Sequence, residues 1–398
     1  MSAKILLLLS TYSIVGFAQD TLARQNQNKF CFCARLIRSL ASPKILTLGN
    51  AQINLALRST YSYLCTKPKI RIMNYRILGK TGYKVSEISL GTWQLGSKWG
   101  DPFDEKVARN TLEAAYEQGI NLFDTADIYQ DGMSEKAVGE FVRSKSEKIY
   151  VVTKCGRKLN PHVAEGYNKD NITRFALDSL KNLGVESLDM LLLHCPPTAV
   201  YHSDEAFTTL DNLKSQGIVR NYGVSVERID EAIAAMQYGI SAIEVIFNMF
   251  RLRPADELFA AAHENNVGII VRVPLASGLL TGKFNENSVF GENDHRNYNR
   301  DGKFFDKGET FSGIDYMTGV KAAKELKEAL GTDNLAETAL RYILMYPEVS
   351  TVIPGASSPQ QIVNNANATQ LPPFTPEQMA IVRDIYNRYI REQVHDKW

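Results

Sequence analysis

The sequence has almost no excess charge of either sign, because 45 lysines and arginines stand against 44 aspartates and glutamates. A near-neutral chain is not drawn to nucleic acids or anionic membranes by its overall charge. Apolar residues make up 44% of the chain, as in ordinary globular proteins. For the main domain we therefore expect neither a nucleic-acid nor a membrane partner. The composition leaves the oligomeric state open.

Cysteine and histidine are also scarce. The cysteines show no spacing typical of a disulfide framework or a zinc site, so we interpret them as free thiols of a reducing compartment, which favours a cytoplasmic location. They are Cys31, Cys33, Cys65, Cys155 and Cys195. Of the six histidines, only His194 stands at the end of a predicted strand. A metal-dependent barrel hydrolase needs several histidine and carboxylate ligands at strand ends, so we expect no metal.

Residues 1–72 contain only one acidic side chain, Asp20. Three interpretations stay open. The apolar run at 5–18 is short for a membrane span but suits a secretory signal, whereas the stretch after it, rich in Arg, Ser and Leu, resembles an organelle transit sequence. In the third interpretation Met73 starts the protein, and what precedes it is an over-extended gene model. In each case the extension lies outside the fold, and residues 73–398 form the domain.

From Met73 onward, short apolar runs alternate with amphipathic stretches in eight units of similar length. Alternating strands and helices predict a parallel sheet, and eight units predict an α/β fold of the (β/α)8 TIM-barrel type. Residues 74–88 predict a β-hairpin that plugs the barrel, and residues 375–394 predict an extra C-terminal helix. An open doubly wound sheet is the alternative. The first strand, however, continues into GTWQLG and not into a G-x-G-x-x-G helix start.

A long polar connection, residues 278–313, follows the seventh predicted strand. It is rich in Gly and Asn and exceeds the length of an ordinary connector. Loops at the carboxyl ends of barrel strands usually carry function. We expect this loop to form a lid over a cofactor or substrate.

Four polar residues stand near the ends of three consecutive apolar runs. They are Asp124, Tyr129, Lys154 and His194. Each could be structural by itself: an aspartate capping a loop, a lysine reaching water, or a hydrogen-bonded loop histidine or tyrosine. Because carboxyl ends of parallel barrel strands meet at one face, the four side chains are expected to converge there. Their joint occurrence favours a catalytic function.

These residue types suit the reduction of a carbonyl group. Tyr129 is the candidate acid, and a free tyrosine has a pKa near ~10. Lys154 is expected to lower the pKa of Tyr129, and Asp124 to keep Lys154 charged and in position. His194 can donate a hydrogen bond to the substrate carbonyl. A cofactor must then supply the hydride.

The segments DTADIYQDGMSE, VVTKC, LLLHCP and IPGASSPQQIVNNANA occur in this order. With them the chain closely resembles the aldo-keto reductase family from Met73 to about Tyr389. The resemblance implies a (β/α)8 barrel, NADP(H), with NAD as a possible substitute, and interconversion of carbonyls and alcohols. It assigns the four catalytic roles to Asp124, Tyr129, Lys154 and His194.

The resemblance also implies a cofactor site. Ser225 matches the residue that holds the nicotinamide carboxamide, and the segment PLASGLLTGK would wrap the pyrophosphate. The implied cofactor-binding residues are Ser225, Arg272, Pro274, Leu275, Gly278, Leu280, Gly282, Lys283, Gly355, Ser357, Ser358, Gln361 and Asn365. The family often has Asn and Gln where this chain has Val226 and Glu244, so the usual pair of amide contacts is altered. Arg272 could stack on the nicotinamide or form a strand-end salt bridge.

The implied substrate pocket contains two aromatic residues, Trp93 and Trp99. Strand alternation points Cys155 and Cys195 away from the site. The leading hypothesis is an NAD(P)H-dependent reductase of a small aldehyde or ketone, with Tyr129 as the acid. The alternative from another class is a cofactor-binding partner or regulatory subunit that resembles potassium-channel β subunits. Turnover of simple aldehydes would discriminate between the two.

Overall fold

The computed structural model describes residues 73–96 and 101–398. Trp99 and the predicted extension at 1–72 lie outside the described residues. Eight parallel strands form one sheet in chain order. They are β3 (Leu90–Gly91), β4 (Leu122–Asp124), β5 (Tyr150–Cys155), β6 (Met190–His194), β7 (Tyr222–Ser225), β8 (Ala242–Ile246), β9 (Gly268–Arg272) and β10 (Val349–Val352).

The sheet closes on itself, as the barrel prediction requires. Parallel bridges join Ile88 to Val352 and Gly91 to Gly355, so the first and last strands are neighbours. The Ser89 N–H donates to the Val352 carbonyl at 2.8 Å, which continues the ladder across the seam. Closure removes both edges of the sheet. The open doubly wound alternative is therefore wrong.

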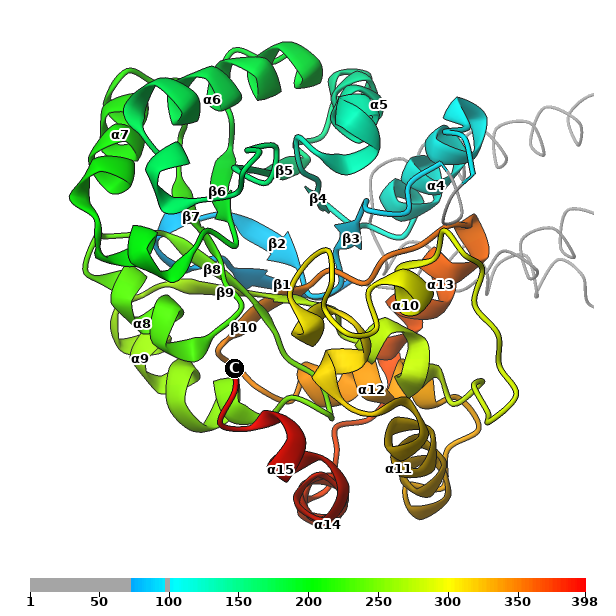
Figure 1. The fold of residues 1–398 in the computed structure, drawn as a ribbon. Helices are drawn as coiled ribbons and strands as arrows, with labels where there is room; N and C mark the ends of the chain where they lie inside the picture. Colours follow the sequence, from blue (N-terminus) through cyan, green and yellow to red (C-terminus); the bar gives the residue numbers. More distant parts are fainter. Residues whose placement is uncertain (1–72, 97–100) are drawn as a thin grey trace, which may run out of the picture. The chain divides into compact units, whose positions relative to one another are not determined.

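Helices surround the sheet on its outer face (Figure 1). The α-helices that follow the strands are α4 (Glu105–Glu117), α5 (Met133–Arg143), α6 (Lys169–Leu183), α7 (Asp204–Ser215), α8 (Ile229–Met236), α9 (Phe259–Glu264), α11 (Tyr316–Ala329), α12 (Leu335–Ile343) and α13 (Pro359–Asn367). Polar caps begin several of them: the Asp104 carboxylate accepts from the Val107 N–H at 2.9 Å at the start of α4. Gly184 ends α6 with a φ of 64°, a conformation that glycine adopts without strain.

The predicted C-terminal helix is present in three consecutive pieces: α14 (Pro376–Ile385), the π-turn η10 (Tyr386–Ile390) and α15 (Arg391–Val394). Shorter helical turns lie in the connections: η1 (Gly79–Thr81), η2 (Tyr129–Gly132), η3 (Ala164–Gly166), η4 (Thr198–His202), η5 (Pro254–Leu258), η6 (Ala276–Thr281), α10 (His295–Tyr298), η7 (Lys307–Glu309), η8 (Phe311–Gly313) and η9 (Ala368–Gln370). Within the described part of the chain, no helix has the length and apolar character needed to cross a bilayer.

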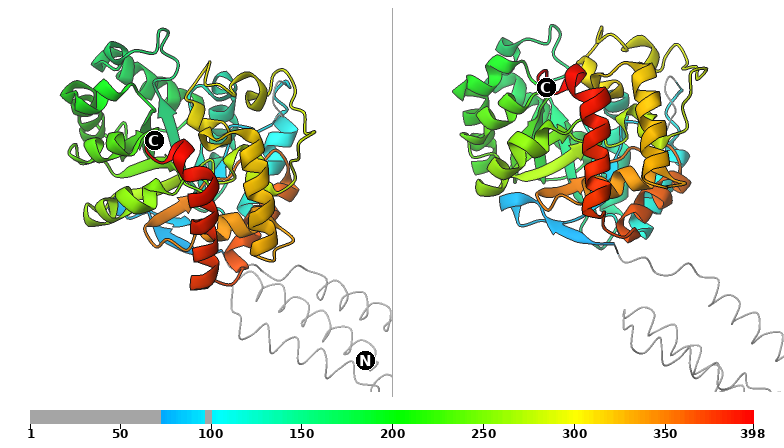
Figure 2. Two further views of the ribbon diagram at one scale, coloured as in Figure 1. Left: turned by 60° about the horizontal axis from the view of Figure 1, so that its bottom comes forward. Right: turned by 90° about the horizontal axis from the view of Figure 1, so that it is seen from below.

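The predicted hairpin consists of β1 (Tyr75–Ile77) and β2 (Lys84–Ser86), which pair antiparallel. It covers the amino-terminal end of the barrel, away from the long loop (Figure 2). Leu78 and Val85 reach from it into the barrel interior and pack with inward residues of the strands, including Leu122 and Val152. Gly79 lies so close to the backbone of β9 that an added Cβ would stand 2.3 Å from the Gly268 nitrogen. The hairpin therefore seals this end by direct packing.

Arg76 fixes the hairpin to the barrel. Its guanidinium bonds to Glu87 at 2.7 Å and donates to the backbone carbonyls of Leu344, Tyr346 and Val349 at 2.7–2.8 Å. These carbonyls lie at and beyond the end of α12, where a helix has no partners of its own for them. One side chain thus satisfies three carbonyls that precede or begin β10.

We expect Arg76→Ala to lower the free energy of unfolding by about 2–3 kcal/mol, because it removes charge-assisted bonds to partly buried carbonyls. Thermal melting followed by circular dichroism measures the change. Arg109→Ala, on the exposed face of α4, is the matched control and should leave the melting temperature close to that of the parent protein. Equal melting temperatures for all three proteins would contradict this role of Arg76.

Candidate active site

Polar residues occupy the inward-facing positions at the carboxyl ends of the barrel strands. Side chains alternate between the two faces of a strand, so every second residue points inward. Leu122, Val152, Leu192, Ala242 and Ile270 belong to the apolar interior core. The residues two positions further along the same strands are Asp124, Lys154, His194, Glu244 and Arg272. The barrel interior therefore changes from apolar to charged toward its carboxyl end.

Lys154 links three members of the predicted catalytic group. Its Nζ lies 2.6 Å from Asp124 Oδ1, 3.3 Å from Tyr129 Oη and 3.0 Å from the Thr125 carbonyl oxygen. The side chain of Lys154 has no exposed surface. Tyr129 is held by η2, the turn that follows β4, and its ring lies 6.0 Å from the His194 ring, edge to face. The structure thus brings all four predicted residues together.

Burial dominates the ionisation of Tyr129. Desolvation raises its pKa above the ordinary value, and the Lys154 ammonium only partly opposes this effect. The expectation of a lowered pKa is therefore wrong in its net direction, because a fully enclosed phenolate loses more solvation than one ammonium returns. Tyr129 is protonated at neutral pH and can act as a proton donor.

The charges around Lys154 favour its protonated form. Burial disfavours the ammonium, but Asp124 and Glu244 outweigh it and raise the pKa of Lys154. Burial and the neighbouring Glu244 raise the pKa of Asp124 well above its ordinary value, against the attraction of Lys154. One ammonium therefore faces two carboxylates that compete for it.

His194 is neutral in this environment. Burial lowers its pKa well below the ordinary value, and the cations Arg157, Lys154 and Arg272 lower it further. Its Nδ1 is enclosed and has no hydrogen-bond partner within the described residues. A neutral imidazole next to Tyr129 can donate one hydrogen bond to a bound carbonyl oxygen.

These residues lie at one cavity of about 1100 Å³. Of the predicted site residues, its lining includes Trp93, Asp124, Tyr129, His194, Arg272, Pro274, Leu275, Gly278, Lys283, Gly355 and Gln361. The others do not line it: Lys154, Ser225, Leu280, Gly282, Ser357, Ser358 and Asn365. Ser225 is buried behind Glu244, and its hydroxyl donates to the Glu244 carboxylate at 3.4 Å. Leu280 is also buried and packs in the outer core.

The far end of the cavity has features suited to an extended anionic ligand. Gly278 has a φ of 98°, so the backbone of η6 turns where a larger residue would be strained. Ser358 precedes α13 without capping it through its side chain, Pro359 has no N–H, and the Gln361 N–H donates to the Ser358 carbonyl at 3.1 Å. Gln361 Oε1 accepts from the Ser357 N–H at 2.7 Å. The lining of the cavity thus includes residues from His194 on β6 to Gln361 on α13.

The near end of the cavity has an aromatic wall. Trp93 lies with its ring centre 6.4 Å from that of Tyr129, 5.0 Å from His295 and 6.1 Å from Phe305. His295 and Phe305 belong to the long loop after β9. His162 also lines the cavity. Neither His162 nor His295 stands at the end of a strand; both reach the cavity from connecting segments. Sequence patterns did not indicate these two residues.

The long loop is attached to the barrel by a cluster of two arginines and two glutamates. Arg157 pairs with Glu309 of the loop and with Glu227 at 3.0 Å. Arg272 pairs with Glu227 at 2.9 Å and with Glu309 at 3.7 Å. Arg272 thus forms the strand-end salt bridge and still lines the cavity. The long loop is therefore attached to the barrel by four charged side chains, of which sequence patterns indicated only Arg272.

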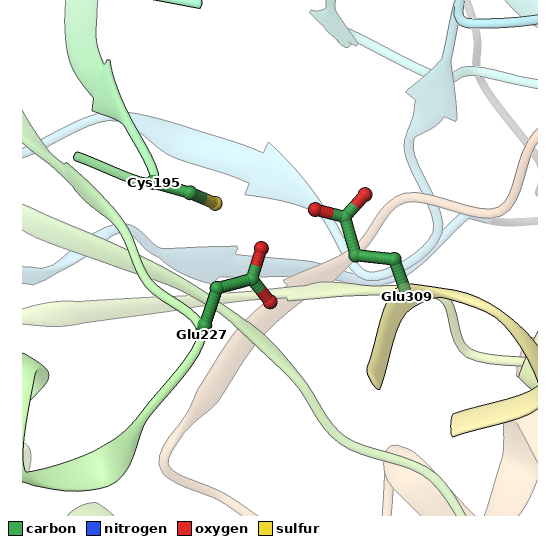
Figure 3. Close-up of side chains that lie close together, drawn as sticks. All are labelled: Cys195, Glu227 and Glu309. Atoms are coloured by element: carbon green, nitrogen blue, oxygen red, sulfur yellow. The ribbon is translucent and has the colours of Figure 1, made fainter. Parts of the chain in front are cut away.

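Cys195, Glu227 and Glu309 point toward one another (Figure 3), with ligand atoms within 4.8 Å. Within the described residues this is the one group with spacing suited to a metal ion. Arg157 and Arg272 already neutralise both carboxylates. Burial raises the pKa of the Cys195 thiol above its ordinary value, so it stays protonated. The positive charge that these groups require is provided by the guanidinium groups.

The expected orientation of Cys195 is wrong. Its sulfur lies 3.5 Å from the Arg272 guanidinium, and the residue lines the cavity. β6 ends at His194, and Cys195 has a positive φ of 47°. Strand alternation therefore no longer applies at this position. Cys155, inside β5, does pack in the core between sheet and helices as expected.

A closed (β/α)8 barrel with a Tyr–Lys–Asp–His group beside a long cavity defines the class of barrel oxidoreductases. The family described as "Aldo/keto reductase family" matches residues 87–387. The chain belongs to this family and is an oxidoreductase of it.

Three relatives illustrate the range of similar proteins. The chain is 30% identical over 299 residues to the "Aldo-keto reductase YhdN" of Bacillus subtilis (strain 168), covering 73% of this chain and 87% of that protein. It is 30% identical over 338 residues to the "Putative voltage-gated potassium channel subunit beta" of Schizosaccharomyces pombe, covering 79% and 93%. The solved aldo-keto reductase AKR11C1 from Bacillus halodurans, in its holo form, is 29% identical with a TM-score of 0.65, covering 81% of this chain and all of that one.

We expect Glu309→Gln to loosen the loop, because it leaves the buried Arg157 short of one carboxylate. The free energy of local opening should fall by about 2 kcal/mol. Hydrogen exchange of residues 304–313, followed by mass spectrometry, measures this change. Glu292→Gln, an exposed residue of the same loop, is the control. Unchanged exchange in Glu309→Gln would show that the ion pairs do not hold the loop.

Proposed function

We propose that the protein is an NAD(P)H-dependent carbonyl reductase that converts an aldehyde or ketone into the alcohol. One observation carries the proposal: a fully buried Lys154 joins Asp124 and Tyr129 by hydrogen bonds next to His194, at the wall of one cavity. A buried lysine costs considerable desolvation energy. Its retention with these partners is best explained by proton delivery from Tyr129.

The roles follow from the contacts. A bound nicotinamide cofactor supplies the hydride. Tyr129 Oη holds the proton that the substrate oxygen receives as negative charge develops there. Lys154 stabilises the phenolate left behind, because its ammonium donates to the same oxygen at 3.3 Å. The neutral His194 orients the carbonyl beside Tyr129. Asp124 fixes the lysine at 2.6 Å and prevents it from turning away.

The cofactor site is proposed from the resemblance together with the cavity. Arg272 would lie at the nicotinamide end, and Ser225, which the resemblance assigns there, donates to Glu244 in this structure. The turn of η6 around Gly278 would hold the pyrophosphate together with Lys283. Gln361 and the start of α13 would hold the adenosine part. Lys283 and Arg296 line the cavity, and Arg296 already pairs with Asp294. The resemblance favours NADPH, and NADH is the alternative donor.

The aromatic wall of Trp93, His295 and Phe305 favours a small aldehyde or ketone with an apolar or aromatic body. The thiols of Cys155 and Cys195 are free, which suits a reducing compartment such as the cytosol. An NADPH-rich compartment would favour reduction over oxidation.

A second candidate function is that of a cofactor-binding regulatory subunit. The similarity to the potassium channel subunit beta of Schizosaccharomyces pombe, at 30% identity, favours it. The intact Tyr129–Lys154–Asp124 contacts favour chemistry, although they are compatible with both activities. Titration of purified protein with NADPH, followed by addition of 4-nitrobenzaldehyde, separates the two. Loss of the nicotinamide absorbance supports the reductase, whereas binding without turnover across an aldehyde panel supports the regulatory subunit.

Tyr129→Phe should reduce turnover of the aldehyde at least about 100-fold, since it removes the hydroxyl group that donates the proton. The dissociation constant for NADPH, measured by protein fluorescence, should change little because the ring is retained. Tyr116→Phe, on α4, is the control and should behave like the parent protein. Substantial activity in Tyr129→Phe would show that another group is the acid.

A further inference from the structure

Glu244 introduces a second carboxylate beside the single ammonium of Lys154. Its Oε2 lies 3.6 Å from Lys154 Nζ, while Asp124 Oδ1 lies 2.6 Å from the same atom. The Lys154 side chain is completely buried, and the two acids are 2–3% exposed. The three hydrogens of the ammonium point to Asp124, Thr125 and Tyr129. Glu244 is thus left with a longer charge contact and no hydrogen bond from the lysine.

Glu244 opens onto the cavity although it is almost completely buried. It is part of the lining, and its Oε2 has no hydrogen-bond partner within the described residues. Its Oε1 accepts only a long bond from Ser225 at 3.4 Å. An enclosed carboxylate oxygen without a donor is unfavourable. Such an atom suits a positively charged or hydrogen-bond-donating ligand.

The surplus of acid has a consequence for proton binding. Two enclosed carboxylates that share one ammonium cannot both ionise without strong mutual repulsion. In agreement with this geometry, burial and Glu244 raise the pKa of Asp124 well above its ordinary value. A proton therefore remains on the pair, and a nearby positive charge would favour its release.

We propose that Glu244 makes this end of the cavity prefer the oxidised cofactor over the reduced one, and that the Asp124–Glu244 pair releases a proton when the oxidised cofactor binds. The inference rests on the proposed function, in which this end of the cavity receives the nicotinamide. The oxidised ring carries a positive charge and the reduced ring does not. A glutamine in place of Glu244, which the family often has, would have no such preference.

The sign of the pH dependence follows from the extra proton. At low pH the pair retains its proton, and the surplus negative charge is absent. As the pH rises the proton leaves, so the oxidised cofactor binds more tightly relative to the reduced one. The dissociation constant of NADP⁺ divided by that of NADPH should fall about tenfold between roughly pH 6 and pH 9, since an opposite charge at close range shifts a pKa by about 1–3 units.

Other titratable and charged groups surround the pair. Tyr129 of η2, Lys154 of β5 and Arg272 of β9 have raised pKa values and stay protonated in this range, and His194 of β6 stays neutral. Glu227, after β7, has a pKa raised by burial to about 8 and does titrate. The 2′-phosphate of the cofactor is common to both forms and cancels in the ratio. Glu227 is retained in a variant at position 244, so a comparison of the two proteins isolates Glu244.

The test measures both dissociation constants by fluorescence titration across this pH range. In Glu244→Gln the ratio should be nearly independent of pH apart from the contribution of Glu227, and about tenfold larger than in the parent protein at high pH. In Asp124→Asn, Glu244 is the only one of the two carboxylates left beside Lys154, so the ratio of the dissociation constants should also lose its pH dependence. This second variant provides the test if Glu244→Gln does not fold. Glu135→Gln is the control, because Glu135 is buried outside the cavity and bonds to Thr153 and Asn182.

A second readout is the proton released on binding NADP⁺, measured with an indicator dye in weak buffer. On binding NADP⁺, the parent protein should release more protons than Glu244→Gln. On binding NADPH, the parent protein should release fewer protons than it does on binding NADP⁺. Identical ratios and identical proton release in the parent and Glu244→Gln would overturn the inference and leave the proposed function intact. Failure of the parent protein to bind either cofactor would overturn both.

Discussion

The candidate active site depends on the enclosure of one ammonium group. Lys154 has no exposed surface, so its charge is tolerated only because Asp124, Thr125, Tyr129 and Glu244 surround it. These partners come from β4, the turn after it and β8. A shift of any of these strands by one residue would turn the charged side chain to the outer face. The ammonium therefore constrains the register of the barrel as well as the position of the phenol.

The mouth of the barrel separates its charges from its aromatic surface. Arg157, Arg272, Glu227 and Glu309 neutralise one another at one side and hold the long loop down. Ser277 strengthens this attachment, since its hydroxyl donates to the Glu309 carbonyl at 3.0 Å and accepts from the Phe311 N–H at 3.1 Å. The loop in turn brings aromatic side chains over the tyrosine. The attachment of the loop thus also places His295 and Phe305 against Trp93 at the cavity.

The sequence allowed prediction of those features that depend on local periodicity. The eight units, the hairpin and the C-terminal helix follow from alternating apolar patterns, and Asp124, Lys154 and His194 stand where an inward position meets a strand end. Glu309 and Phe305 had no comparable signal, because their function comes from tertiary contacts of an irregular loop. The error at Cys195 has the same origin: alternation predicts orientation only while the strand continues. The pKa of Tyr129 depends on enclosure, which a sequence does not reveal.

Charge balance connects the catalytic group to the rest of the cavity. Around its inner end the carboxylates are Asp124, Glu227, Glu244 and Glu309, and the cations are Lys154, Arg157 and Arg272. Arg157 and Arg272 pair with Glu227 and Glu309, while Asp124 and Glu244 lie against Lys154, directly beside the tyrosine. A fold can host many functions, and the contents of its site decide among them. In this barrel the unusual content is Glu244, a carboxylate where an amide would have been electrically neutral, and it lies 3.6 Å from the ammonium that contacts Tyr129.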